Sequence, residues 1–150
     1  MTLLDTISHD MKIAMKSGEK LRLETLRTIR AGLLEKQVEK RPAGNMTSDD
    51  EVSVLISASK KRKEAIDIYR QNSRPDLADQ EEQELAVIQE YLPKQISPEE
   101  IETITKRIIV EVGASSAKDF GKVMTPVMKE VKGKADGKLV QETVKRLLGG

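Results

Sequence analysis

Cysteine and tryptophan are absent from this chain of 150 residues, and the aromatic side chains are limited to two tyrosines and one phenylalanine. The lack of cysteine excludes disulfides and thiolate metal sites. No apolar run approaches the roughly 20 residues that a membrane-spanning helix requires, and the N-terminal residues lack the basic start and apolar centre of a secretory signal. We therefore expect a cytoplasmic protein that has an aliphatic core and that contacts neither a membrane nor a metal.

Residue types that carry catalysis are scarce. His9 is the only histidine, and no Gly-x-Ser-x-Gly motif accompanies it. The paired acids Asp49–Asp50 and Glu81–Glu82 are better explained as helix-start charges and solvated faces. The stretch 113–122 has seven residues between its glycines, whereas a phosphate-binding P-loop needs four. We expect no catalytic residue, no cofactor and no metal site.

Charged residues are plentiful but unevenly distributed. They make up 34% of the chain, with a net charge of +1. Residues 12–41 hold nine Lys or Arg against four acids, residues 47–96 hold seven against eleven, and residues 118–150 hold eight against four. Two basic segments thus flank an acidic one, which permits a polyanionic partner.

Apolar residues recur at helical spacing in almost every segment, and no alternating strand pattern survives inspection. Breaks are expected at Gly18, 41–45, 72–75, 92–98 and Gly113. The segment 92–98 holds two prolines, and Ser97 followed by Pro98 is typical of a helix start. We place a domain boundary there. The prediction is an all-α protein with a bundle of about four helices in residues 1–93 and a three-helix unit in residues 97–150.

Several basic residues of the N-terminal domain need an explanation. On a helical wheel Arg22 and Arg30 fall in or beside the apolar stripe, so each must pair with an acid, extend to water or serve a partner. We favour structural pairing. The run Lys60–Lys63 points around the whole circumference of a helix, which favours a solvated surface over a flat nucleic-acid contact.

The stretch VKGKADGKLV, residues 131–140, combines two glycines with an aspartate. Gly133 can take the left-handed conformation that ends a helix. Asp136, at which we expect the last helix to start, can cap that helix, and Gly137 belongs to the same structural turn. The preceding helix contains Pro126, which either kinks it or starts a new turn capped by Thr125.

Three lysines stand in the same stretch. Lys132 lies near a helix C-terminus, where positive charge is favourable. Lys134 and Lys138 lie near the following N-terminus, whose free N–H groups attract anions. The stretch is either a plain turn with solvated lysines or an anion-binding site.

These segments together resemble the GatB/YqeY family, and in particular a free-standing YqeY-like protein. The resemblance covers nearly the whole chain, and it is carried by LETLRTIRAGL at 23–33, KKRKEAIDIYRQNSRPDLADQEEQELAVIQEYLPKQISPEEI at 60–101 and GKVMTPVMKEVKGKADGKLV at 121–140. The last segment is similar to the tRNA-engaging tail of the B subunit of the glutamine-dependent aspartyl/glutamyl-tRNA amidotransferase. The chain departs from the family pattern at Thr125–Pro126, where a small residue is common.

The resemblance implies an accessory protein that binds tRNA or another structured RNA, or a tRNA-handling enzyme. It implies RNA-binding roles for seven basic residues, which are Lys122, Lys129, Lys132, Lys134, Lys138, Arg27 and Arg30. The family-level carbon–nitrogen ligase activity, with glutamine as amido donor, belongs to the larger assembly of the relatives, and we expect no amide-forming chemistry in this chain alone. The alternatives are a protein–protein interaction module without RNA contact and an amidotransferase component that acts in trans.

Overall fold

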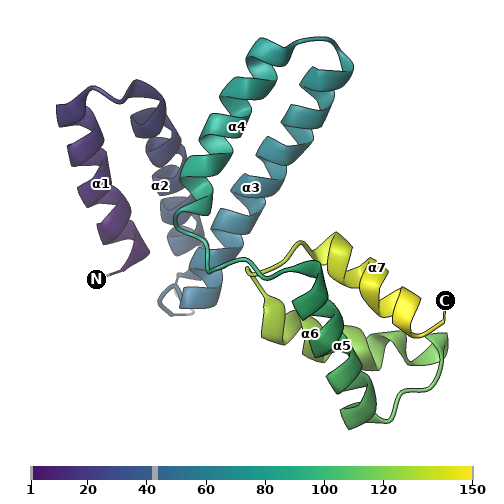
Figure 1. Cartoon of the computed structure of the whole chain (residues 1–150). Helices are drawn as coiled ribbons and strands as arrows, with labels where there is room; N and C mark the ends of the chain where they lie inside the picture. The colour runs from purple at the N-terminus through teal and green to yellow at the C-terminus, as the bar shows by residue number, and fades with distance from the viewer. Residues whose placement is uncertain (1, 42–43, 150) are drawn as a thin grey trace. The chain divides into compact units, whose positions relative to one another are not determined.

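The computed structural model describes residues 2–41 and 44–149. Within these ranges the protein consists of seven α-helices and one 3-10 turn, with no β-strand, so the all-α prediction is confirmed (Figure 1). The chain divides into two compact units, Met1–Leu92 and Pro93–Gly150. None of the described helices combines the length and the apolar character that crossing a membrane would require.

The N-terminal unit contains four helices, as predicted. They are α1 (Leu3–Ser17), α2 (Lys20–Lys40), α3 (Ser48–Gln71) and α4 (Pro75–Gln89). Figure 1 shows two helical hairpins, α1 with α2 and α3 with α4. Helix α4 also packs on α2, and α2 and α3 share a smaller interface than either hairpin. The expected break at 41–45 includes residues 42 and 43, which lie outside the described ranges.

The core of this unit is aliphatic, as the composition predicts. Its buried residues are Ile7, Ala14, Leu26, Ile29, Leu33, Leu55, Val87 and Ile88. Gly18 ends α1 with a φ of 75°. Thr47 caps α3 through a reciprocal bond with Asp50, whose carboxylate accepts from the Thr47 N–H at 2.8 Å. The hydrogen bonds that the Asp50 carboxylate accepts from the Thr47 N–H and hydroxyl lower its pKa to about 2, and the charge of Lys40 adds to this effect.

Helix α4 ends at Gln89, two residues before the end that the sequence suggested. The chain tightens there into a turn, in which the Tyr91 N–H donates to the Ile88 carbonyl at 3.0 Å and the Leu92 N–H donates to the Gln89 carbonyl at 3.3 Å. Pro93 follows, and the residue before a proline is restricted away from helical dihedrals. The turn therefore replaces the last residues of the expected helix.

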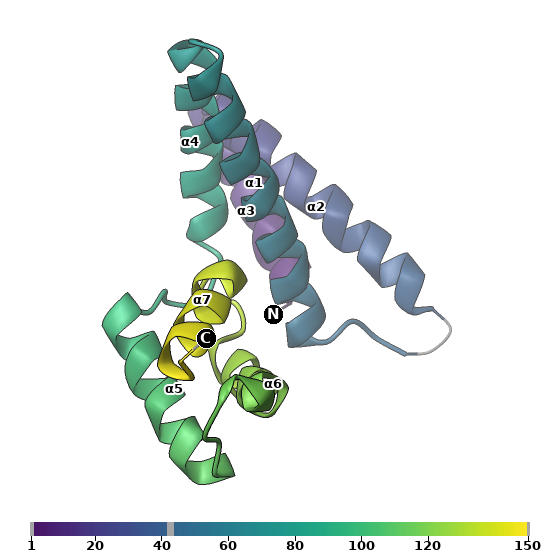
Figure 2. The same ribbon diagram turned by 90° about the vertical axis from the view of Figure 1, so that its right-hand side faces the viewer.

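The C-terminal unit contains three helices, as predicted. They are α5 (Pro98–Val112), α6 (Phe120–Val131) and α7 (Gly137–Leu147), with a 3-10 turn at Ala117–Asp119 before α6. Each helix packs on the other two to a similar extent (Figure 2). The buried core is again aliphatic, and its members are Ile101, Ile108, Val123, Val127, Val131, Val140, Val144 and Leu148.

Pro126 lies inside α6 rather than at a helix start. The helix runs without a break from Phe120 to Val131, so the alternative in which Thr125 caps a new turn is wrong. Because proline has no N–H, the carbonyl of Lys122 loses its donor one turn ahead. Val123, Val127 and Val131 are fully buried, and this packing holds the helix together across the missing bond.

Candidate nucleic-acid interface in the C-terminal unit

The turn between α6 and α7 is fixed by its backbone. Gly133 has a φ of 77° and is buried, and the Lys134 N–H donates to the Val131 carbonyl at 2.8 Å. The left-handed glycine predicted from the sequence is therefore present. It turns the chain sharply enough for α7 to pack back on α6.

The segment before α5 holds the same turn from its other side. The Ile96 N–H donates to the Lys134 carbonyl at 2.9 Å, and the side-chain amide of Gln95 donates to the Gly133 carbonyl at 2.7 Å. Both central carbonyls of the turn thus have donors. The backbone that carries the lysines is fixed before any ligand binds, which reduces the entropy that binding must offset.

Asp136 caps α7 as expected. Its Oδ1 accepts from the Lys138 N–H at 3.0 Å, and α7 begins at Gly137. The carboxylate therefore occupies part of the helix end that we expected to attract anions. An anion at this turn would have to be held mainly by the lysine side chains rather than by free backbone N–H groups.

The five lysines that the sequence singled out in this unit are all exposed. Lys122 forms an ion pair, with 3.8 Å between its Nζ and Asp119 Oδ1. The pKa of Asp119 is lowered, first by the Ser115 N–H and then by Lys122. Within the ranges that the structure describes, none of the other four forms an ion pair. These four are Lys129, Lys132, Lys134 and Lys138.

Three other cations of the same unit are paired. Arg107 bonds to Glu130 and to Glu111, and both Lys106 and Arg146 bond to Glu102. Two hydrogen-bonded cations lower the pKa of Glu102. The lysines of the turn form no ion pair with the described residues, so their charge is available to a partner.

Helix α6 presents two of these lysines on one side. Lys122 and Lys129 are seven residues apart on a continuous helix, which places them on the same side and about 10 Å apart along the axis. The departure at Pro126 therefore does not interrupt the helix that carries them.

Sequence reasoning missed two further exposed lysines of this unit, Lys145 and Lys94. Lys145 follows Lys138 by seven residues on α7, and both are exposed. This spacing was a usable signal. Lys94 precedes Gln95, whose amide bonds to Gly133. No sequence signal pointed to Lys94, because a bond that spans 38 residues brings it to the turn. We call the set formed by Lys94, Lys129, Lys132, Lys134, Lys138 and Lys145 the lysine surface.

Arg27 and Arg30 lie in the other unit, on α2, and each has a partner there. The Arg27 guanidinium bonds to Glu24, and Arg30 Nε donates to Ser8 Oγ at 3.3 Å. The structural pairing favoured for the arginines in the apolar stripe is clearest at Arg22, which donates to Glu90 at 2.6 Å.

The run Lys60–Lys63 is not uniformly solvated. Arg62 is largely buried, with its side chain 14% exposed, and its Nε lies 3.9 Å from Glu81 Oε2. The three lysines of the run are exposed.

Comparison with known proteins places the whole chain in one family. Residues 4–148 match the sequence profile of the family described as Yqey-like protein. The chain belongs to the YqeY-like family. This confirms the resemblance to a free-standing YqeY-like protein.

Several fungal proteins are similar to this YqeY-like chain. A Pyrenophora tritici-repentis protein is 31% identical over 98% of the chain and 81% of its own length. Matches in Vanderwaltozyma polyspora and Lachancea thermotolerans are 33% and 28% identical over 69% and 75% of the chain. The chain spans only 56% and 63% of the lengths of these two relatives.

The names of these relatives correct one expectation. All three are called altered inheritance of mitochondria protein 41, mitochondrial, which contradicts the cytoplasmic location inferred from the sequence. That inference rested on the lack of a secretory signal and of a membrane helix. Neither feature bears on entry into mitochondria, where leader segments are amphipathic and rich in arginine.

Proposed function

We propose that this YqeY-like protein is an accessory RNA-binding protein whose lysine surface holds the phosphate backbone of tRNA or another structured RNA. The observation that carries the proposal is the contrast within the C-terminal unit. Lys106, Arg107 and Arg146 are paired with acids, whereas the lysines at the fixed turn have no such partner among the described residues. The similarity of segment 121–140 to a tRNA-engaging tail supports the same role.

The chemistry of this surface favours phosphate contact over base recognition. Phe120 is the only aromatic residue of the C-terminal unit, and it packs against the core. Base stacking therefore contributes little, and lysine ammonium groups act as point charges toward phosphate. Such binding follows the shape and charge of a folded RNA more than its sequence, and it weakens steeply as salt rises.

The experiment is fluorescence anisotropy with labelled tRNA at low salt, comparing the wild type with the triple variant K132A/K134A/K138A. We expect the variant to lose at least tenfold in affinity while its helical content is unchanged. The matched control is K12A/K16A/K20A, which removes the same charge from exposed positions of α1 and α2. Equal losses in both variants, or no binding by the folded wild type, would refute the proposal.

A further inference from the structure

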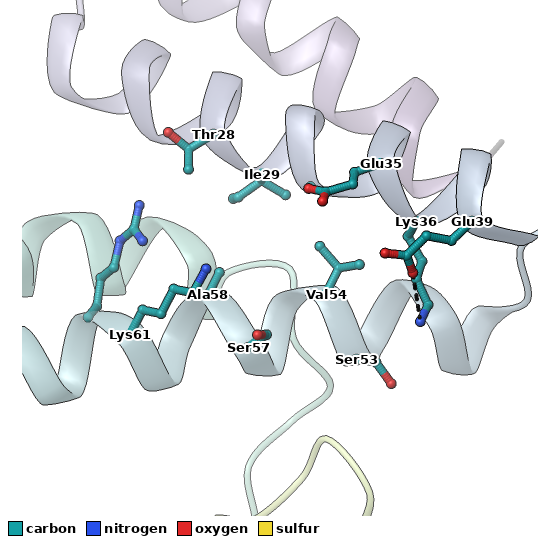
Figure 3. Close-up of a pocket in the computed structure, with 12 residues that line it drawn as sticks. Thr28, Ile29, Glu35, Lys36, Glu39, Ser53, Val54, Ser57, Ala58 and Lys61 are labelled. Atoms are coloured by element: carbon teal, nitrogen blue, oxygen red, sulfur yellow. Dashed lines mark ion pairs between the residues drawn. The ribbon is translucent and has the colours of Figure 1, made fainter.

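A groove of about 320 Å³ lies between α2 and α3 in the N-terminal unit, and it has no part in the proposed RNA contact (Figure 3). The two helices approach closely at Gly32, where a Cβ atom would meet Val54 Cγ1 at 3.1 Å. Helix α4 packs on both helices but contributes no residue to the groove. It therefore covers the opposite side of the helix pair and leaves this side open.

The lining of the groove is small and partly apolar. Gly32, Val54 and Ala58 form its partly exposed apolar surface, and Ser57 is an exposed small residue beside them. Ile29 also lines the groove but is only 1% exposed. Figure 3 shows Ile29 and Val54 facing one another from the two helices. Small side chains along a groove let the backbone of another helix approach, and an amphipathic helix laid in a groove is a recurrent mode of recognition.

Charge distinguishes the two ends of the groove. Glu35 lines it from α2, and Lys61 lines it from α3. Neither forms an ion pair with any residue in the described ranges. Because the α2–α3 contact is at Gly32 and Val54, Glu35 lies one turn beyond the contact and Lys61 lies two turns away from it in the other direction. The two charges are therefore about 10 Å or more apart along the groove.

Arg62 adds little to the positive end. It lines the groove beside Lys61, and its Nε is buried without a hydrogen-bond partner among the described residues. Its nearest acid, Glu81, is 3.9 Å away, which is beyond hydrogen-bond distance. Because this Nε is buried and the guanidinium is ion-paired with Glu81, the charge that a partner can reach at this end is that of Lys61.

We propose that this groove docks an amphipathic helix of a partner protein. The helix presents small apolar residues to Val54 and Ala58, an acidic residue to Lys61, and a basic residue to Glu35. The shallow groove and its mixed lining fit a weak, reversible contact, as expected for an accessory protein that attaches to a larger enzyme. The RNA contact and the protein contact then use different units of the chain.

The probe is a fluorescent 16-residue helical peptide with an Ala/Leu face, one glutamate near one end of that face and one lysine more than two turns away. A second peptide has the two charges exchanged and is otherwise identical. Anisotropy at low salt with the full chain should give about a fivefold preference for one of the two peptides, since two solvent-accessible ion pairs differ between the complexes. Amide chemical shifts should change along α2 and α3.

The decisive variant is E35K/K61E, which reverses both groove charges and should reverse the peptide preference. The matched control is K60E, because Lys60 is exposed beside Lys61 but does not line the groove. It should leave the preference unchanged. The proposal fails if the double variant keeps the wild-type preference, if neither peptide shifts the groove amides, or if the groove is instead occupied by a second copy of the chain in sedimentation experiments.

Discussion

Tyr91 donates its phenolic hydrogen to Asp10 Oδ2 over 2.5 Å and so ties the turn after α4 to α1. Arg22 of α2 donates to the same hydroxyl at 3.3 Å and to Glu90 at 2.6 Å. Three separate elements therefore meet in one polar cluster at the edge of an aliphatic core. Burial, followed by the bond to Asp10, raises the pKa of Tyr91 well above its ordinary value.

Removing the Tyr91 hydroxyl should weaken this connection. We expect Tyr91→Phe to lower the free energy of unfolding by about 1 kcal/mol. The substitution removes the hydrogen bond to Asp10, and it leaves the partly buried Asp10 and Arg22 side chains without the Tyr91 hydroxyl as a partner. Chemical denaturation followed by circular dichroism measures the change. Tyr69→Phe is the control, since the Tyr69 hydroxyl bonds to none of the described residues. Equal effects of the two substitutions would contradict this account of the cluster.

Glu84 should make stability depend on pH. Burial and then repulsion from Glu81 raise its pKa, against a smaller opposing effect of Arg62. The folded state therefore holds the proton more tightly than the unfolded state, and stability falls as pH rises through and above the ordinary value of 4.5. Glu84→Gln should unfold at a higher temperature than the wild type at pH 7, and this advantage should shrink toward pH 4.

The control for Glu84→Gln is the same substitution at a solvent-exposed glutamate. Glu64 is exposed on α3, so Glu64→Gln should show no such pH-dependent gain. If the difference in unfolding temperature between Glu84→Gln and the wild type were the same from pH 4 to pH 7, ionisation of Glu84 would not destabilise the folded state.

The two glycines of the turn should respond differently to alanine. Gly133 has a φ of 77°, a region that costs an L-residue about 1–2 kcal/mol. Gly137→Ala places a Cβ at an ordinary 3.7 Å from Met128 Cε and improves helix propensity. We expect Gly133→Ala to speed hydrogen exchange of the α6 and α7 amides and to weaken tRNA binding. Gly137→Ala should do neither, and similar behaviour of the two variants would argue against a fixed turn.

An acid on α7 should oppose the proposed RNA contact. Glu142 lies four residues after Lys138 and three before Lys145, so it shares their outward side of the helix. Removing its charge should strengthen tRNA binding about twofold at low salt, with less effect as salt screens the interaction. Anisotropy with Glu142→Gln tests this, with Glu64→Gln as the control in the other unit. Weaker binding by Glu142→Gln would place the RNA elsewhere.

The local parts of the fold could be predicted from the sequence because their signals are local. Gly18 and Gly113 end helices, and Ser97 and Asp136 cap them, at the positions that their residue types indicated. These effects depend on neighbouring dihedrals and N–H groups, which a few consecutive residues determine.

Other features depend on tertiary packing and left no such signal. The bonds from Gln95 to Gly133 and from Ile96 to Lys134 each join residues 38 positions apart, and they bring Lys94 to the turn. The continuity of α6 through Pro126 depends on buried valines that offset a missing bond. The α2–α3 groove depends on a close approach at Gly32, and a glycine within a helical pattern does not say which helix it will meet.

The salt dependence of tRNA binding tests the central claim most directly. Each lysine that neutralises a phosphate contributes about one unit to the slope of log K against log salt. We predict that K132A/K134A/K138A binds tRNA more weakly than the wild type, with a slope shallower by about three, whereas K12A/K16A/K20A keeps the wild-type slope. An unchanged slope in the first variant, or the same reduction in both, would contradict an RNA contact through the lysine surface.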